Sequence, residues 1–401
     1  MNPSAVDIPT SEVAGHPPQT ATARPRVLHV LASLTHGGIE TWLMHMLRRH
    51  EMFSVEHEVL LTRGEPGDYE EEARQLGIRI HKLPMGPNKF AWLHDFRRFL
   101  AETGPYAAVH SHVYLFSAPV LAAARKAKVP VRIAHCHTAR SRGADHQTLR
   151  HRIRRAVAIK WMKRAATRRI GISGAAIEEI AGNSWRSENS ACVLLYGFDF
   201  SRFDGAEAKS GALRKRLGID AKALVIGHIG RFHAVKNHPF LVKAFAALLE
   251  SLPNAQLVLA GDGPVLDETR ALVASLGIER SVHFPGATNE VPAYMAMFDL
   301  FVLPSFSEGL GIVCVEAQAA GTRSLVSDAV AAEASVIPGA VEFLSLSSGS
   351  KAWAETMARL LEMPKPDPAD WLRQVESSNF AIGRCVDELD SIYRSEMARG
   401  E

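Results

Sequence analysis

Two glutamates, Glu308 and Glu316, stand at the two ends of the stretch EGLGIVCVE. Between them lie a glycine-rich bend and an apolar run, which predict a loop leading into a helix. Carboxylates on either side of a helix start can accept hydrogen bonds from the hydroxyls of a sugar and of a ribose. An ordinary capped helix with two incidental glutamates explains the same residues, so the pair alone leaves both interpretations open.

The bend between the glutamates also suits an anion. The N–H groups of Gly309, Leu310 and Gly311 precede the predicted helix, where amides are unpaired and the helix dipole is positive. Phosphate is a typical ligand of such a position.

Two cations, Arg231 and Lys236, stand in the stretch GRFHAVKNH. Arg231 directly follows a predicted strand, and Lys236 comes just before a predicted helix. Two cations at such a turn can neutralise a diphosphate, which gains negative charge as it leaves. Either one alone is explained as a surface charge, but together they favour a functional turn ahead of the glutamates.

A glycine pair, Gly37 and Gly38, separates the first predicted strand from the first predicted helix, where it would let the backbone approach a ligand closely. The G-x-G-x-x-G fingerprint and the P-loop motif are both missing, which argues against dinucleotide-binding enzymes and P-loop ATPases. Since no Asp-x-Asp motif lies in a suitable loop, we expect chemistry without a metal ion, with Arg231 and Lys236 in its place.

The elements that must position these residues follow from the hydropathy pattern, in which strand-like runs alternate with helical ones. The series restarts once, which predicts two doubly wound α/β domains facing each other across a cleft, with ligands at the carboxyl ends of parallel strands. The expected strands lie at 26–34, 57–62, 79–84, 106–112, 131–137, 168–173, 190–199, 223–232, 255–264, 282–287, 299–305 and 323–328. The expected division is a disordered tail at 1–24, an N-terminal domain at 25–203, a C-terminal domain at 204–382 and a helix at 383–401 that can pack on either domain.

Composition agrees with a globular protein of more than one core, since 401 residues are 47% apolar and 22% charged. No apolar run is long enough to span a bilayer, and the first residues lack the apolar segment of a secretory signal. The four cysteines form no C-x-x-C pair, which argues against a zinc site or a disulfide framework. We therefore expect a cytoplasmic protein.

Charge is unevenly distributed along the chain. Residues 1–200 hold 27 Lys and Arg against 18 Asp and Glu, whereas residues 201–401 hold 19 against 25. Residues 147–169 alone hold nine basic residues and no acidic one, with an apolar stripe at helical spacing. This segment is either a helix that lies on anionic lipid or an ordinary helix with its stripe in the core. A nucleic-acid partner is not expected, because no binding motif surrounds the segment.

As a set, these features resemble the retaining glycosyltransferases of family 4, which have the two-domain GT-B fold, and in particular the bacterial branch that builds exopolysaccharide and capsule. The resemblance covers roughly residues 25–395. It rests on LHVLASLTHGGIET, VHSH, RIAHCHT, YGFDFSRF, IGHIGRFHAVKNHPFL, LVLAGDGP, VPAYMAMFDLFVLPSFSEGLGIVCVEAQAAG and SLVSD, which stand in the family's order and spacing.

The resemblance implies roles for the acidic and basic residues. Glu308 looks like the first glutamate of the family's E-x7-E motif, which contacts the transferred sugar, and Glu316 like the second, which holds the ribose. Arg231 and Lys236 look like the pair that grips the donor diphosphate. The resemblance thus implies a catalytic set of Glu308, Arg231, Lys236 and His137.

The resemblance also implies roles on the N-terminal side. Gly37 and Gly38 look like the loop that closes on the diphosphate. His137 matches the family's histidine near the donor sugar, and His135, two residues away on the same strand face, is the alternative. A plain strand-end imidazole explains either histidine as well.

Two positions depart from the family's pattern. Relatives in this branch usually carry proline where this chain has Gly311, and NG[IV]D where it has YGFD at 196–199. Neither change removes a charge or a donor group, but both can alter loop shape and thereby the choice of donor.

The function implied is transfer of a sugar, with retention, from a UDP- or GDP-sugar to a saccharide. The expected acceptor is carried on a polyprenyl diphosphate at the inner face of the plasma membrane. In this mechanism the departing phosphate accepts the acceptor's proton, and no residue forms a covalent intermediate. The alternatives are a nucleotide-sugar epimerase of the GT-B fold and a non-catalytic nucleotide-sugar-binding protein. The sequence does not select the donor base, the sugar, the acceptor or the linkage.

Overall fold

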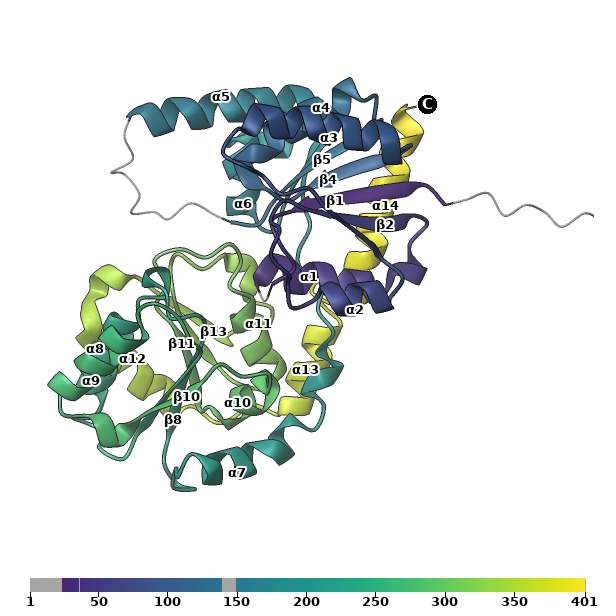
Figure 1. Ribbon diagram of the computed structural model, residues 1–401. Coiled ribbons are helices and arrows are strands. Elements are labelled where there is room, and N and C mark those ends of the chain that lie inside the picture. The colour runs from purple at the N-terminus through teal and green to yellow at the C-terminus, as the bar shows by residue number, and fades with distance from the viewer. Residues whose placement is uncertain (1–23, 36, 139–148, 401) are drawn as a thin grey trace, which may run out of the picture.

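The computed structural model describes residues 24–35, 37–138 and 149–400. Two parallel sheets form two α/β domains, each with helices on both faces of its sheet (Figure 1). The expected fold class is therefore confirmed. Nearly all of the expected tail at 1–24 lies outside the described residues.

The N-terminal domain contains a seven-stranded sheet in the order β3-β2-β1-β4-β5-β6-β7. All its strand pairs are parallel, which requires a crossover between successive strands. The strands are β1 (Arg26–Leu31), β2 (Glu56–Leu61), β3 (Arg79–Lys82), β4 (Ala108–Ser111), β5 (Val131–Cys136), β6 (Arg168–Gly171) and β7 (Ala191–Val193). The helices are α1 (Gly38–Leu47), α2 (Glu70–Gln75), α3 (Lys89–Thr103), α4 (Ser117–Lys126), α5 (Leu149–Ala165) and α6 (Gly174–Ala181).

The C-terminal domain contains a six-stranded parallel sheet in the order β10-β9-β8-β11-β12-β13. Its strands are β8 (Val225–Ile229), β9 (Gln256–Ala260), β10 (Val282–Gly286), β11 (Leu300–Leu303), β12 (Ser324–Ser327) and β13 (Val341–Leu344). Its helices are α7 (Ala206–Arg216), α8 (His238–Leu248), α9 (Leu266–Ser275), α10 (Val291–Met297), α11 (Ile312–Ala319), α12 (Gly349–Glu362) and α13 (Pro368–Glu376). The edge strand β13 was not expected, because its partly exposed residues lack the apolar pattern of a buried strand.

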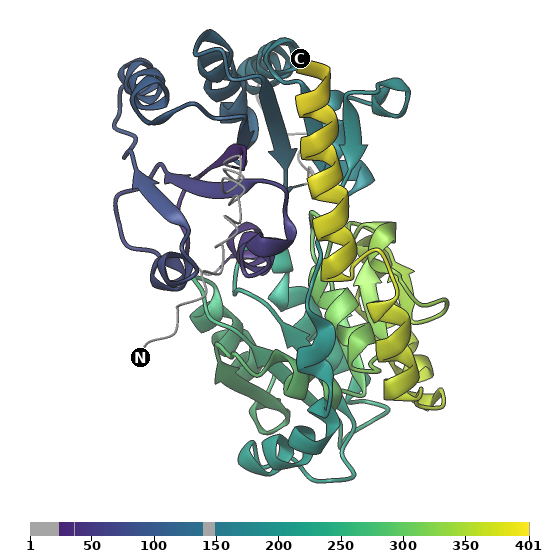
Figure 2. The ribbon, with the colours of Figure 1, turned by 90° about the vertical axis from the view of Figure 1, so that its right-hand side faces the viewer.

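The last helix, α14 (Ile382–Gly400), returns to the N-terminal domain and runs along it (Figure 2). The Tyr393 hydroxyl lies 2.7 Å from Nδ1 of His110, and Asp390 accepts hydrogen bonds from the amide and the hydroxyl of Ser54. Where the chain crosses back, Phe198 and Ala381 form an isolated parallel bridge. Of the two expected placements, the helix takes the one on the N-terminal domain.

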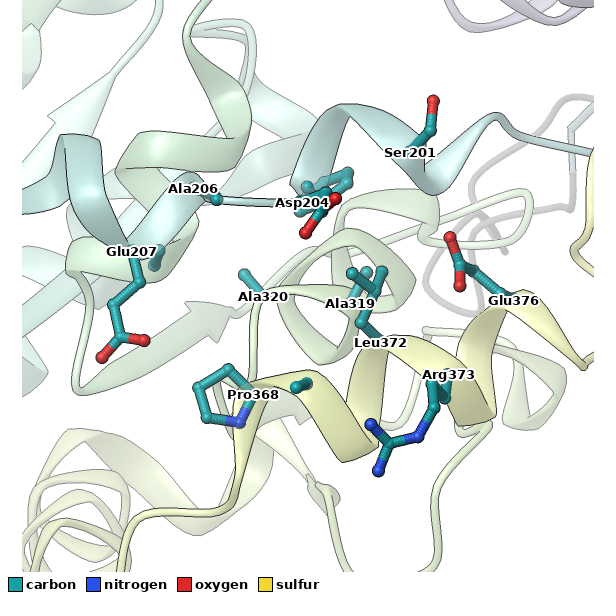
Figure 3. A pocket seen from close by; sticks show the side chains of 14 residues that line it. Ser201, Asp204, Ala206, Glu207, Ala319, Ala320, Pro368, Leu372, Arg373 and Glu376 are labelled. Carbon is teal, nitrogen blue, oxygen red and sulfur yellow. The ribbon is translucent and has the colours of Figure 1, made fainter.

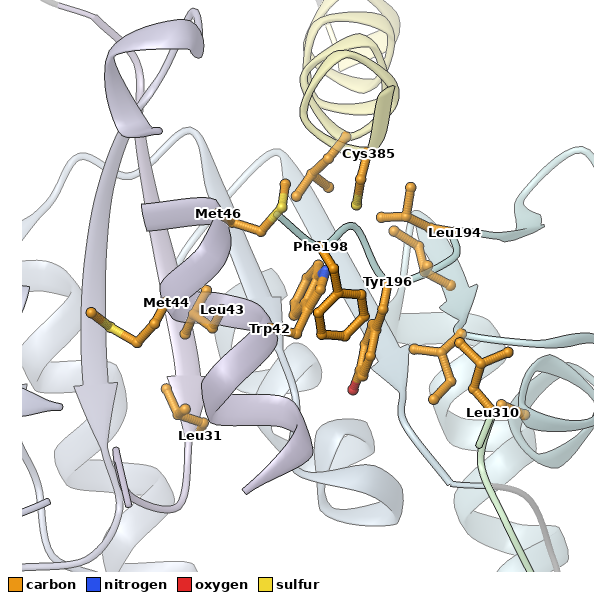
Figure 4. Close-up of a cluster of buried hydrophobic side chains, with 14 of the residues drawn as sticks. Leu31, Trp42, Leu43, Met44, Met46, Leu194, Tyr196, Phe198, Leu310 and Cys385 are labelled. Atoms are coloured by element: carbon orange, nitrogen blue, oxygen red, sulfur yellow. The ribbon is translucent and has the colours of Figure 1, made fainter. Parts of the chain in front are cut away.

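The stretch 194–205, between β7 and α7, is named the crossing segment. An aromatic cluster lies where α1, α14 and the crossing segment meet (Figure 4). The rings of Trp42 and Tyr196 stack with centroids 5.3 Å apart, and Phe198 and Cys385 are buried beside them. Leu310, which belongs to the other domain, is buried in the same continuous core. Apolar packing therefore ties the loop after β11 to the N-terminal domain.

Helix α5 exposes its apolar stripe. Ile153 is 55% exposed, Val157 59% and Trp161 44%, whereas Met162 and Ala165 are buried. The interpretation that placed the whole stripe in the core is wrong, because the helix packs by a neighbouring face. Over the described residues, no helix has the length and apolar character needed to cross a membrane.

Candidate active site

The loop at 304–311, between β11 and α11, carries the first glutamate and is named the glutamate loop here. The Glu308 carboxylate is 12% exposed and accepts a hydrogen bond from Nζ of Lys236 at 2.7 Å. It also accepts one from Oγ of Ser305 at 2.6 Å. Two of the predicted residues thus form an ion pair, and the serine donates a second hydrogen bond to the same carboxylate oxygen, Oε1.

The turn between β8 and α8 holds the two predicted cations. The amide of Phe306 donates to the carbonyl oxygen of Val235 at 2.8 Å, which joins this turn to the glutamate loop. Lys236 is 21% exposed and paired with Glu308. Arg231 is exposed, and its guanidinium has no hydrogen bond or ion pair with any residue that the structure describes. An unpaired guanidinium beside a paired ammonium leaves positive charge for an anionic ligand.

The backbone of the glutamate loop has the amides expected of an anion site. Within the described ranges, no residue accepts a hydrogen bond from the N–H of Gly309, Leu310 or Gly311. Gly311 caps α11 in the left-handed region, with φ +80. The Leu310 side chain is buried, so this residue can contact a ligand through its backbone but holds the loop with its side chain.

Gly37 and Gly38 lie at the N-terminus of α1, and both are exposed. They follow β1, and the carboxyl ends of parallel strands share one edge of the sheet. A Cβ on Gly37 would come 2.4 Å from Oε2 of Glu40, whereas one on Gly38 would meet open space. The exposed backbone of the pair is consistent with the expected approach to a ligand.

His137 directly follows β5 next to the glutamate loop, but its ring points into the N-terminal core. Nε2 lies 2.8 Å from Nδ1 of His112, and Nδ1 lies 2.6 Å from the hydroxyl of Tyr196. Its carbonyl oxygen packs against Gly309, since a Cβ on that glycine would be 2.4 Å away. His135 is buried deeper and bonds His110. Both imidazoles are therefore engaged within the protein, and His137 reaches the loop through its backbone.

Sequence reasoning missed the residues that join the two domains at this site. Oγ of Ser173 donates to the carbonyl oxygen of Gly309 at 2.7 Å, and the amide of Gly174 donates to Glu333 at 2.8 Å. Ser173 also caps α6, and that local role is its only signal in the sequence. Contacts between domains join residues that are far apart in the sequence, so they produce no periodic hydropathy pattern that could predict them.

Tyr196, the first residue of YGFD, occupies the position where the resemblance leads us to expect asparagine. Its buried hydroxyl holds His137, and its ring stacks on Trp42. The residue at this departure from the expected pattern therefore contacts a predicted site residue.

A cavity of about 410 Å³ lies at the other end of α11, between the crossing segment and α13 (Figure 3). Ala319 and Ala320 line it together with Asp204 and Leu372. None of the predicted site residues lines it.

Glu316 projects from α11 in a partly buried position that water reaches poorly. Burial raises the pKa of its carboxyl from 4.5 to about 7, and Arg202 opposes part of this rise. A carboxyl with this pKa becomes charged near neutral pH, and a bound hydroxyl would replace some of the water that it has lost.

We expect Glu316 to make stability depend on pH. Because its pKa is raised in the folded protein, its contribution is full below pH 4.5 and is lost as pH rises through about 7. Glu316→Gln should therefore gain up to about 3 kcal/mol over the wild type between pH 5 and pH 8, by urea unfolding. Glu355→Gln, at an exposed position of α12, is the control. Parallel curves for wild type and Glu316→Gln would contradict the expectation.

Two family descriptions match the chain, one in each domain. Residues 37–195 match "Glycosyl transferase 4-like domain" and residues 210–376 match "Glycosyl transferases group 1". The chain is 34% identical over 348 residues to EpsF of Bacillus subtilis (strain 168), a protein named as a glycosyltransferase by assignment. The match covers 86% of this chain and 90% of EpsF. The D-inositol 3-phosphate glycosyltransferase of Actinosynnema mirum is 28% identical over 327 residues, covering 74% and 76%.

Solved structures agree with this assignment at the level of the fold. HepE of Anabaena in complex with UDP superposes with a TM-score of 0.77 at 21% identity, covering 92% of this chain and all of HepE. WaaG, a glycosyltransferase of lipopolysaccharide biosynthesis, gives 0.68 at 17% identity, covering 92% and 99%. With matches to both domains and to EpsF over most of its length, the chain belongs to the family 4 glycosyltransferases of the GT-B fold.

Proposed function

We propose that this glycosyltransferase moves a hexosyl group, with retention, from a UDP- or GDP-sugar to a saccharide in cell-surface polysaccharide biosynthesis. The observation that carries the proposal is the arrangement of Glu308, Lys236 and Arg231 around the open amides of the glutamate loop. This arrangement offers a carboxylate for the sugar and positive charge for a diphosphate at one point.

Each group has a distinct task in the proposed reaction. Lys236 and Arg231 bind the diphosphate and stabilise the charge that it gains as the bond to the sugar breaks. Glu308, kept in place by Ser305, accepts hydrogen bonds from the sugar, and Glu316 accepts them from the ribose. The departing phosphate takes the acceptor's proton, so no side chain serves as a covalent nucleophile. Because the two cations balance the diphosphate, we propose that transfer needs no metal ion.

The donor can be identified by a thermal-shift screen of the full chain. A ligand that binds only the folded state raises the unfolding midpoint, and at equal concentration a tighter ligand raises it more. UDP-glucose is the first candidate, since HepE has been crystallised with it, and GDP- and ADP-sugars complete the series. Nucleoside diphosphate that appears only when an acceptor is added would support transfer. Interconversion of the donor without an acceptor would indicate an epimerase, and binding without turnover a non-catalytic protein.

We further propose that the acceptor is linked to a lipid diphosphate and that α5 lies on the inner face of the plasma membrane, in an otherwise cytoplasmic protein. The support is the exposure of Ile153, Val157 and Trp161 on a helix rich in basic residues. Apolar side chains at a basic surface match the interface of an anionic bilayer.

We expect the protein to bind vesicles that contain anionic phosphatidylglycerol, and to lose this binding steeply as salt rises, because salt screens the attraction. Trp161→Ala should weaken co-sedimentation with the vesicles. Phe90→Ala, which removes a highly exposed aromatic side chain from the start of α3, is the matched control. Vesicle binding that does not change with salt concentration, or equal binding by the two variants, would contradict the proposal that α5 binds the membrane.

A further inference from the structure

A layer of buried histidines lies between the N-terminal sheet and the helices α1 and α14, and is named the histidine layer here. Residues two apart on a strand point to the same face, which explains why the strands contribute pairs. Burial lowers the pKa of every imidazole in the layer, so all of them are neutral near pH 7. The members are His29, His57, His110, His112, His135 and His137.

In His112, His135 and His137, one ring nitrogen lies within hydrogen-bonding distance of a residue outside this group of three; we call it the outer nitrogen. Nε2 of His112 lies 3.1 Å from Nδ1 of His29. Nδ1 of His135 lies 3.2 Å from Nε2 of His110, and that ring in turn reaches the hydroxyl of Tyr393. Nδ1 of His137 lies 2.6 Å from the hydroxyl of Tyr196. These contacts fix all three rings by their outer nitrogens.

The other nitrogens of the same three residues converge. Nδ1 of His112 and Nε2 of His137 are 2.8 Å apart. Nε2 of His135 is buried and has no hydrogen-bond partner, although the residue is only 1% exposed. One ligand nitrogen from each of the three rings lies within 4.8 Å of the other two. A buried nitrogen without a partner is costly, so its presence in a ring of this cluster needs an explanation.

We infer that His112, His135 and His137 form a binding site for one zinc-class divalent cation. Neutral imidazole is the form that ligates a metal, and each ring would donate its outer N–H to a partner already in place, as ligating histidines commonly do. Three nitrogen donors suit zinc, cobalt, nickel or copper rather than magnesium or calcium. The Trp42 ring covers all three imidazoles, with centroids 5.0–5.9 Å away.

The neighbouring group of His29, His110 and His112 is a poorer site, although its ligand atoms are equally close. His29 has both ring nitrogens engaged, by His57 and His112, and His110 has both engaged, by Tyr393 and His135. A metal there would break existing bonds. In the chosen group, the metal replaces one contact and satisfies the nitrogen that has none.

Little movement of His112 and His137 relative to each other is needed to admit the ion. Zinc–nitrogen bonds of about 2.0–2.1 Å place two ligands of a tetrahedral ion roughly 3.3 Å apart. The pair formed by His112 and His137 would therefore open by roughly half an ångström from its present 2.8 Å. The bound ion would fix the end of β5, where the carbonyl oxygen of His137 packs on Gly309. It is a structural ion, separate from the metal-free transfer proposed above.

The test uses the full chain with a purification tag that contains no histidine, expressed with added zinc or cobalt. The rings are buried, so loading is expected during folding, and loosely bound metal is removed with EDTA. We expect about one ion per chain by elemental analysis, and the visible absorption of nitrogen-bound cobalt in the cobalt-loaded protein. A wild type that retains well below one ion per chain would overturn the inference.

Two variants separate the site from adventitious binding. His135→Gln should lose the retained metal and the cobalt absorption. His228→Gln is the matched control, because His228 is an equally buried histidine with an unpartnered Nε2 in the other domain. It should keep both signals. Metal retained by His135→Gln, or lost equally by the control, would overturn the assignment. If His135→Gln does not fold, the wild-type metal content and cobalt spectrum still decide.

Discussion

Lys236→Ala should lower turnover about 100- to 1,000-fold, the usual effect of removing one group that stabilises charge in a transition state. The lysine is held 2.7 Å from Glu308, so the substitution removes the cation and also leaves a poorly hydrated carboxylate unpaired. Release of nucleoside diphosphate at saturating donor, with an acceptor present, measures the effect.

The control for this variant is Lys243→Ala, which removes an exposed lysine from α8, the helix that follows the turn of Lys236, and should keep turnover near wild type. Glu308→Gln should reduce turnover to a similar degree as Lys236→Ala, since it keeps the shape of the side chain but removes its charge. Unchanged thermal midpoints would establish that both variants are folded. Near wild-type turnover in both would show that the site is assigned wrongly.

Gly311→Ala should destabilise the protein by about 2–5 kcal/mol. A left-handed backbone costs an L-residue about 1–2 kcal/mol, and a crowded side chain adds about 1–3 kcal/mol. Both apply here, because φ is +80 and a Cβ would come 2.7 Å from Cγ1 of Val330. Urea unfolding measures the loss, and donor affinity should fall with it, because the same residue sets the direction of the loop amides.

Gly211→Ala is the matched control, since Gly211 lies exposed in α7 with open space around its Cβ position. Alanine there should be neutral or slightly stabilising. The double change of Gly311→Ala with Val330→Ala should recover the crowding part of the loss but not the backbone part. A Gly311→Ala protein as stable as the wild type would contradict the strain argument.

The same backbone angle bears on the proline that the resemblance leads us to expect at this position. Proline fixes φ near −65°, which is incompatible with the value of +80 at Gly311. A chain with proline here would have to run this loop differently. We propose that this difference in backbone path is how the loop shape influences the choice of donor.

The sequence was sufficient for the fold class and for the local setting of each charged residue. Strand-like runs followed by turns placed Arg231, Lys236 and Glu308 at carboxyl ends of strands, because that pattern is local. The ion pair between Lys236 and Glu308 is not local, since it depends on β8 pairing with β11. Strand order in a sheet is set by packing of the whole domain and cannot be read from a run of residues.

The sequence was insufficient where the environment of a side chain depends on several elements. A histidine at the end of a strand has the same sequence signal whether its ring meets a ligand or the core. The ring of His137 is turned inward by His112 of the β4 end and by Tyr196 of the crossing segment. Exposure of the stripe on α5 was undecided for the same reason, since the spacing of apolar residues gives their common face but not what lies against it.

The hydrogen bonds of Ser173 and Gly174 across the domain boundary have a consequence for the order of events in turnover. The carbonyl oxygen of Gly309 is bound by the N-terminal domain, so separating the domains would break this bond. Under the proposed function, the loop that binds the donor is completed by a residue of the acceptor-side domain. Product escape and the loss of the donor site's geometry would then be one step, which would limit the time that an activated sugar spends exposed to water.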